Sequence, residues 1–345
     1  QAMLTPIPGV RNIISIASGK GAVCKSTTAV NLALALASEG ARVGILDADI
    51  YGPSQPRMLG LLNRTLESHD GKTFEPLVAH GLQVSSIGFM IDEEKPLIWR
   101  GPMVTQALQQ LAFQSNWNDL DYLLVDLPPG TGDAQLTLTQ KVPLAGAIII
   151  TTPQDVALAD ARKGLKMFEA VGVPVLGVIE NMSTFICPCC DKETEIFGSG
   201  GGERLAQESG VTLLGKLPLD GRIRAETDGG RPTVVADPDG PIANRYREIA
   251  RAAAAALAKR PKDQRGKFGT GQLDPPDGGG AGHDRAFRAG PGAGGGRQAR
   301  DFLRHFELWL RCALRAAVQG VHEHQFDDRR SEGLRQEQLR RHGRR

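Results

Sequence analysis

Residues 19–28 read Gly19-Lys20-Gly21-Ala22-Val23-Cys24-Lys25-Ser26-Thr27-Thr28, and this stretch decides the fold. An apolar run, Asn12–Ala17, precedes it, and a helical pattern, Ser26–Ser38, begins within it. A glycine-rich loop between a strand and a helix is typical of a phosphate site, because backbone N–H groups and the helix N-terminus surround the anion. Lys25 adds positive charge, and the Ser26 hydroxyl is a suitable magnesium ligand. We therefore predict a nucleotide site at residues 19–27.

The chain on either side of this loop, to about Lys259, alternates short apolar runs with helical patterns. Further strands are expected at Arg42–Asp47, Tyr122–Asp126, Gly146–Thr151, Val173–Glu180 and Leu213–Leu217. Further helices are expected at Val156–Val171, Gly201–Ser209 and Ile242–Leu257. The strands lack polar alternation, which indicates that both faces of the sheet are covered. The pattern predicts an α/β fold with a doubly wound, mainly parallel sheet, whose functional residues gather at the carboxyl ends of the strands.

Two carboxylates follow predicted strands and fit the chemistry of phosphoryl transfer. Asp49 lies just beyond the second strand, where a carboxylate can hold or activate the attacking water. Asp126 ends a later strand, where it can support Mg²⁺ through water, and Gly130 is free to follow the γ-phosphate. A lone Asp after a strand is usually a cap, but here it occurs together with the phosphate loop.

Lys20 carries a family resemblance, because it resembles the signature lysine of the deviant Walker A group of MinD, ParA and ArsA-like ATPases. Further motifs are Tyr51-Gly52-Pro53-Ser54, Trp99-Arg100-Gly101-Pro102, the loop Asp126–Asp133 and Asn181-Met182-Ser183. Together, from about Ile7 to Leu257, the chain resembles the Mrp/ApbC family of iron–sulfur cluster carrier ATPases. The resemblance implies the SIMIBI/MinD-like P-loop NTPase fold, ATP hydrolysis, and a homodimer closed over nucleotide in which Lys20 reaches the partner's phosphates. It also implies that Asn181 contributes to adenine choice, although a strand-end turn former explains this residue equally well.

The phosphate loop departs from the usual family pattern, Gly-Lys-Gly-Gly-Val-Gly-Lys-Ser, at Ala22 and Cys24. If the backbone keeps the conformation that glycine allows, a Cβ at position 24 costs on the order of 1–3 kcal/mol. We expect weaker nucleotide binding, and hydrolysis is in question. The Cys24 thiol lies at a helix N-terminus beside two lysines, which predicts a lowered pKa and high reactivity. An inert small residue is the alternative.

Three of the five cysteines form the cluster Cys187-Pro188-Cys189-Cys190. The two-residue spacing of Cys187 and Cys190 lets both sulfurs face one metal, but one pair supplies only two of the four ligands that a cluster or zinc needs. A twofold dimer would supply the other pair, and the family resemblance implies a bridging cluster, of the 4Fe-4S type. The alternatives are an intersubunit zinc site and a redox pair. The latter is disfavoured because the motif does not open a helix after the first strand.

We therefore expect ATP-dependent binding of an iron–sulfur cluster and its transfer to apo-proteins. One alternative is a MinD/ParA-like positioning ATPase that acts on membrane or DNA, which the cysteine pair disfavours. The other is a cluster scaffold in which Ala22 and Cys24 impair hydrolysis.

The composition separates residues 1–259 from a tail, residues 260–345. The tail carries 18 Lys and Arg against 11 Asp and Glu, which leaves the body mildly acidic although the whole chain is +2. The body thus gives no reason to expect nucleic acid, and no apolar run is long enough for a bilayer. Clustered cysteines and the lack of a visible signal predict a cytoplasmic protein. The Arg/Gly-rich tail is expected to be disordered or frameshift-derived.

Overall fold

The computed structural model describes residues 5–50, 52–90, 101–187, 190 and 192–260, all within one compact unit, Gln1–Gln272. Several positions named above lie outside these ranges: Tyr51, Trp99, Arg100, Cys189 and the tail from residue 261 onward.

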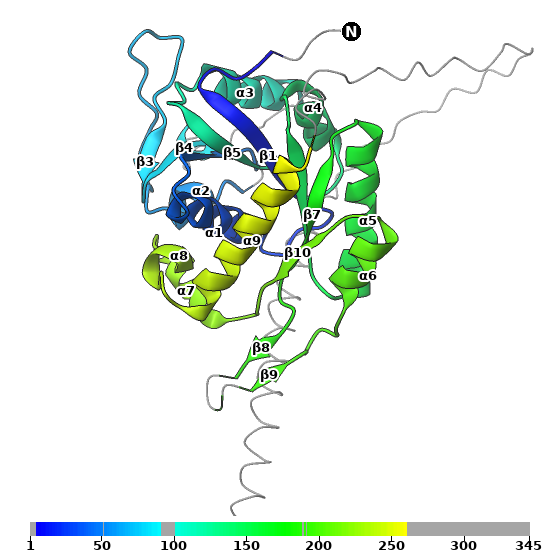
Figure 1. The fold of residues 1–345 in the computed structure, drawn as a ribbon. Coiled ribbons are helices and arrows are strands. Elements are labelled where there is room, and N and C mark those ends of the chain that lie inside the picture. Colours follow the sequence, from blue (N-terminus) through cyan, green and yellow to red (C-terminus); the bar gives the residue numbers. More distant parts are fainter. Residues whose placement is uncertain (1–4, 51, 91–100, 188–189, 191, 261–345) are drawn as a thin grey trace, which may run out of the picture. The chain divides into compact units, whose positions relative to one another are not determined.

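The described residues form one large sheet of eight strands in the order β10-β7-β6-β1-β5-β2-β4-β3 (Figure 1). Their bounds are β1 Val10–Ser18, β2 Val43–Asp47, β3 Leu77–Ala79, β4 Leu82–Ser86, β5 Leu120–Asp126, β6 Gly146–Thr151, β7 Val175–Glu180 and β10 Leu213–Lys216. Every neighbouring pair is parallel except β3 and β4. The predicted mainly parallel sheet is therefore confirmed, and the edge hairpin of β3 and β4 is an addition.

Helices cover both faces of this sheet (Figure 1). Their bounds are α1 Lys25–Ser38, α2 Gln55–Met58, α3 Gly101–Gln114, α4 Asp133–Lys141, α5 Asp155–Ala170, α6 Gly201–Glu208, α7 Gly221–Asp228, α8 Thr233–Ala236 and α9 Pro241–Ala258, with a short 3₁₀ turn at Ile87–Phe89. The four predicted helices correspond to α1, α5, α6 and α9. Within the described ranges, none of these helices has the length and apolar character that a bilayer crossing needs.

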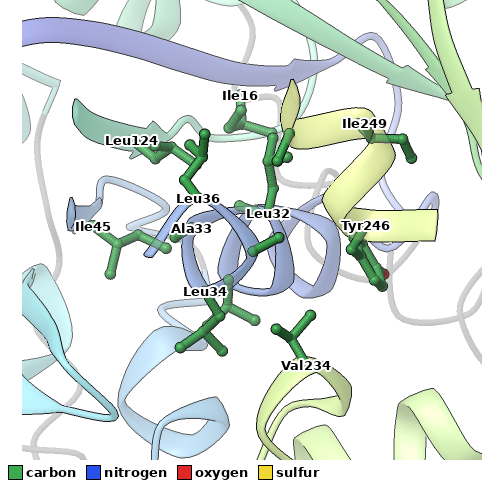
Figure 2. Packing of buried hydrophobic residues seen from close by; sticks show 14 of the residues in the cluster. Ile16, Leu32, Ala33, Leu34, Leu36, Ile45, Leu124, Val234, Tyr246 and Ile249 are labelled. Atoms are coloured by element: carbon green, nitrogen blue, oxygen red, sulfur yellow. The ribbon is translucent and has the colours of Figure 1, made fainter. Parts of the chain in front are cut away.

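Two buried clusters form the core, one on each face of the sheet. Ile14 and Ile16 of β1 belong to the cluster under α1 and α9, where Leu32 and Tyr246 pack (Figure 2). Their neighbour Ile13 belongs to the other cluster, with residues of α3 and α5. Since alternate side chains of a strand point to opposite faces, a strand that is covered on both sides must be apolar throughout.

The carboxyl ends of the central strands meet at one edge of the sheet. β1 pairs with β5 on one side and with β6 on the other, and β2 pairs with β5. The loop after β1 and the carboxylates after β2 and β5 are therefore neighbours. Open α/β sheets bind their ligands where the strand order reverses direction, and in this sheet the order reverses beside β1.

Candidate functional site

The loop between β1 and α1 has the backbone of a phosphate loop, although two of its positions carry side chains. Ala22 has φ 65° and Cys24 has φ 56°, both in the left-handed region that favours glycine. Gly19 is needed for another reason, because a Cβ there would overlap the backbone of Asp160 in α5. The sequence predicts an energetic cost if the loop keeps the conformation that glycine allows. Ala22 and Cys24, the two residues that replace glycines of the family pattern, both have that conformation.

Hydrogen bonds hold this loop from three sides. The Ser18 hydroxyl donates to the Lys20 carbonyl at 2.9 Å. Gly130, at φ 94°, donates its N–H to the Ser18 carbonyl at 3.0 Å and so ties the loop after β5 to the end of β1. The Asn181 amide nitrogen donates to the Val23 carbonyl at 2.9 Å. The loop is therefore built into the sheet edge.

Lys25, the first residue of α1, brings the predicted site residues together. Its Nζ donates to Asp126 Oδ1, lies 3.7 Å from Asp49 Oδ2, and donates to the Ser26 hydroxyl at 3.2 Å. The side chains of Lys25 and Asp126 are 5% and 0% exposed. A buried ion pair of this kind leaves an uncompensated charge if either partner moves away.

Asp47 and Gln55 also belong to this site, and sequence reasoning missed both. Asp47 accepts hydrogen bonds from the backbone N–H groups of Asp49, Ser54 and Gln55 and from the Ser86 hydroxyl. Burial, and next the charge of Asp126, raises the pKa of Asp47 to about 7. These bonds fix the segment that carries Asp49.

The Gln55 side chain, which is fully buried, links this segment to the rest of the site. Its Nε2 donates to Asp126 Oδ2 at 2.9 Å and to the Ser26 carbonyl at 3.1 Å. Its Oε1 is buried and has no hydrogen-bond partner among the residues that the structure describes. Since buried acceptors are normally satisfied, this oxygen suits a donor such as a water bound to a cation.

The donor set fits a magnesium–nucleotide complex. The Ser26 hydroxyl and the carboxylates of Asp49 and Asp126 are hard oxygen donors, which Mg²⁺ prefers, and they lie at the start of α1. The N-terminus of α1 and the Lys25 ammonium suit phosphate. Ser26 and Asp126 would support the metal, which would neutralise phosphate charge.

The expectation of an acidified Cys24 thiol is wrong. Cys24 is exposed, yet desolvation raises the pKa of its thiol to about 11. Exclusion of water from a thiolate therefore outweighs the attraction of the helix N-terminus and the lysines. The alternative, an inert small residue, is the one that the structure favours.

Cys187 and Cys190 lie between β8 (Phe185–Ile186) and β9 (Glu193–Thr194), the two strands of a small hairpin that extends beyond the large sheet (Figure 1). The two strands pair antiparallel, and Cys187 donates its N–H to the Lys192 carbonyl at 3.1 Å. Cys187 is half-buried and Cys190 is exposed. In the part of the chain that the structure describes, no group of three or more His, Cys, Asp and Glu is placed to hold a metal. These two thiols alone form an incomplete metal site.

A family model described as ParA, NUBPL iron-transfer P-loop NTPase, matches residues 9–254. The chain belongs to this family. The NUBPL-type assignment agrees with a relative named iron–sulfur cluster carrier protein from Pseudomonas fragi, 58% identical over 251 residues that cover 72% of this chain and 88% of that one. The resemblance to the cluster-carrier ATPases is thereby confirmed.

Solved structures place this NUBPL-type chain in the same fold. A nucleotide-binding protein from Archaeoglobus fulgidus, in complex with ADP, is 36% identical with a TM-score of 0.60, covering 68% of this chain and 91% of that one. The cell division ATPase MinD of Pyrococcus furiosus has a TM-score of 0.55 at 23% identity, over 71% of this chain and 98% of its own. The predicted MinD-like P-loop NTPase fold is confirmed.

Proposed function

We propose that this protein binds an iron–sulfur cluster between two copies of its chain and transfers it to apo-proteins in a manner that depends on ATP. The observation that carries the proposal is the position of the pair Cys187 and Cys190, separated by two residues on a hairpin of a P-loop NTPase. The name of the 58% identical relative supports it.

The homodimer follows from the number of ligands. A 4Fe-4S cluster is held by four thiolates, and the two cysteines supply half of them. A twofold interface presents the same pair twice and completes the set. Three cysteines within four residues also fit a reducing compartment, and we therefore assign the reaction to the cytoplasm.

At the nucleotide site, we propose a role for each residue. Lys25 and the loop backbone bind the phosphates, and the Ser26 hydroxyl and Asp126 support magnesium. Asp49, beside Lys25, positions the water that attacks the γ-phosphate. Lys20 lies half-buried in the loop. We assign it the role that the family resemblance implies, a contact with the phosphates bound by the partner subunit.

Nucleotide controls the cluster if the open and closed dimers bind it with different affinity. A ligand shifts such an equilibrium only through its differential affinity for the two states. We propose that ATP favours the dimer in which the cysteine pairs meet and that hydrolysis favours release.

Reconstitution tests this function. The full chain is loaded anaerobically with iron and sulfide, and cluster transfer to an apo-ferredoxin is followed by absorbance with Mg-ATP, with Mg-ADP and without nucleotide. We expect transfer from the wild type, a different rate with ATP, and no loading of the Cys187→Ser variant. Stoichiometric zinc in a colourless protein would contradict the proposal, and so would equal loading of the variant.

A cluster scaffold with impaired hydrolysis is a second candidate, favoured by the side chains of Ala22 and Cys24 in left-handed positions. ATP turnover decides between the two functions. If the Ala22→Gly/Cys24→Gly double variant turns over ATP at least tenfold faster than the wild type, the side chains impair catalysis. Equal turnover would remove this candidate.

A further inference from the structure

One peptide group of the phosphate loop is held by a side chain from another strand. The Val23 carbonyl, which lies between the left-handed residues Ala22 and Cys24, accepts the hydrogen bond from Asn181 Nδ2 at 2.9 Å. Asn181 is only 6% exposed. Its Oδ1 accepts from the Met182 N–H at 2.9 Å, and its own N–H donates to the Thr151 carbonyl at 2.8 Å. The side chain is thus fixed at both of its polar atoms.

This bond also sets the direction of an N–H group. A trans peptide is planar, and its C=O and N–H point in opposite directions. Holding the Val23 carbonyl against Asn181 therefore turns the Cys24 N–H away from Asn181. Cys24 immediately precedes α1, so that this N–H belongs to the group of helix-terminal donors that an anion recruits.

Asn181 is also where the chain leaves the large sheet for the cysteine hairpin. Met182, at φ 55°, is buried, and Ser183 donates through both its N–H and its hydroxyl to the Leu217 carbonyl, at 2.9 and 3.0 Å. Leu219 then donates its N–H to the Thr184 carbonyl at 2.7 Å. The backbone is thus anchored up to β8, directly before Cys187.

The far strand of the hairpin is attached to the body as well. Glu193 of β9 forms an ion pair with Arg245 of α9 at 2.8 Å. This partly exposed ion pair is a second and weaker point of attachment between the hairpin and the body. Coupling between distant sites is carried by contiguous packed and hydrogen-bonded residues, and residues 181–186 are contiguous between the phosphate loop and the cysteine hairpin.

We propose that residues 181–186 connect the phosphate loop to the cysteine hairpin, with Asn181 as the positioning residue that senses whether the loop is occupied. The inference rests on the proposed nucleotide and cluster function and adds the route between the two sites. It also gives Asn181 a role that is independent of adenine.

Two ligands separate these roles: Mg-ATP and Mg-tripolyphosphate, which lacks the nucleoside. Binding of each to the full-length wild type and to Asn181→Ala is measured by calorimetry. If Asn181 acts through the loop, its loss weakens both ligands by the same factor, about tenfold, which corresponds to about 1.4 kcal/mol. Ser183→Ala is the matched control, because it removes only the buried hydroxyl bond to Leu217, whereas the Ser183 N–H still anchors the backbone to the Leu217 carbonyl and the Val23 contact stays intact.

The second readout is the alkylation rate of Cys187 and Cys190, resolved by peptide mass spectrometry. It is measured on cluster-free protein at a concentration where light scattering gives a monomer. We expect tripolyphosphate to change these rates at least twofold in the wild type and in Ser183→Ala, and to leave them unchanged in Asn181→Ala. If Asn181→Ala does not fold, Asn181→Ser replaces it, and we expect the same loss of affinity and of the response to tripolyphosphate.

Three results would overturn the inference while leaving the proposed function intact. The first is an unchanged affinity of the Asn181 variants for both ligands. The second is a loss of affinity for ATP alone, which would indicate an adenine contact. The third is that tripolyphosphate does not change the alkylation rates of the wild type. If the wild type binds neither ligand, the inference and the proposed nucleotide function both fail.

Discussion

The buried ion pair between Lys25 and Asp126 makes a sharp prediction about metal dependence. Lys25 cannot serve the phosphates fully while its ammonium remains on Asp126 Oδ1. Withdrawal of the lysine without a replacement cation leaves a carboxylate that is 0% exposed without its partner. Breaking a buried pair in this way costs about 3–5 kcal/mol, which is roughly a 100- to 4,000-fold loss of affinity.

The perturbation is Asp126→Asn, and the assay is calorimetric titration with ATP, once with excess Mg²⁺ and once with EDTA. We expect the wild type to bind ATP at least about 100-fold more weakly in EDTA, because magnesium is absent as the replacement cation. The variant has no carboxylate to leave unpaired. It should therefore bind metal-free ATP at least about tenfold more tightly than the wild type does.

The metal-free comparison is decisive because the variant also loses a magnesium-supporting group. That loss by itself would weaken binding with Mg²⁺ and leave binding in EDTA unchanged. Asp121→Asn is the matched control, since it removes the same charge from the same strand at a partly exposed ion pair with Arg42. If Asp126→Asn and wild type bind metal-free ATP equally, the reasoning about the ion pair is refuted.

Three further predictions concern the loop and its surroundings. The double variant Ala22→Gly/Cys24→Gly removes two side chains from left-handed backbone positions. It should raise the free energy of unfolding, measured by urea titration, by about 1–2 kcal/mol after allowance for the backbone entropy of glycine. An unchanged free energy of unfolding would show that the two positions are unstrained. Contrary to the weaker nucleotide binding expected from the sequence, this double variant should change ATP affinity less than about threefold, because the unliganded loop already has the left-handed conformation. Gly19→Ala should destabilise the fold by about 1–3 kcal/mol, whereas Gly21→Ala, where a Cβ meets nothing within 4 Å, should not; equal effects would contradict the packing argument. Because the pKa of Asp47 is raised to about 7, the folded chain holds one proton more than the unfolded chain between about pH 4 and 7, and the stability from this group falls as the pH rises through that range. Between about pH 5 and 7.5 the free energy of unfolding should therefore fall less for Asp47→Asn than for the wild type. Parallel curves of stability against pH would argue against the raised pKa.

The large sheet could be predicted because parallel strands that are covered on both faces are continuously apolar. Each of the six predicted strands is present: β6 has the predicted bounds, and the others have small shifts at their ends, such as β7 beginning at Val175 instead of Val173. Helix α4 was missed because Leu136 and Leu138 alternate with polar residues, a pattern typical of a strand. Its position after the Asp126 loop decides its conformation, and that context is not local.

The candidate site was predictable where a motif carries the chemistry, as for Lys25, Ser26 and the carboxylates that follow strands. Gln55 carries no such signal, because its role depends on the turn that brings it under Asp126. The Asp47 carboxylate was available in the Asp-Ala-Asp stretch, but only the structure shows that it accepts three backbone N–H groups. The raised pKa of Cys24 likewise depends on packing around the thiol.

The claim that one chain supplies half of a cluster site is tested most directly by the mass of the loaded protein. Light scattering coupled to gel filtration, with iron and sulfide determined in the same peak, measures chains per cluster. We expect a dimer that contains one cluster, and a Cys190→Ser variant that stays monomeric and unloaded. A monomer that holds a complete cluster would contradict the account.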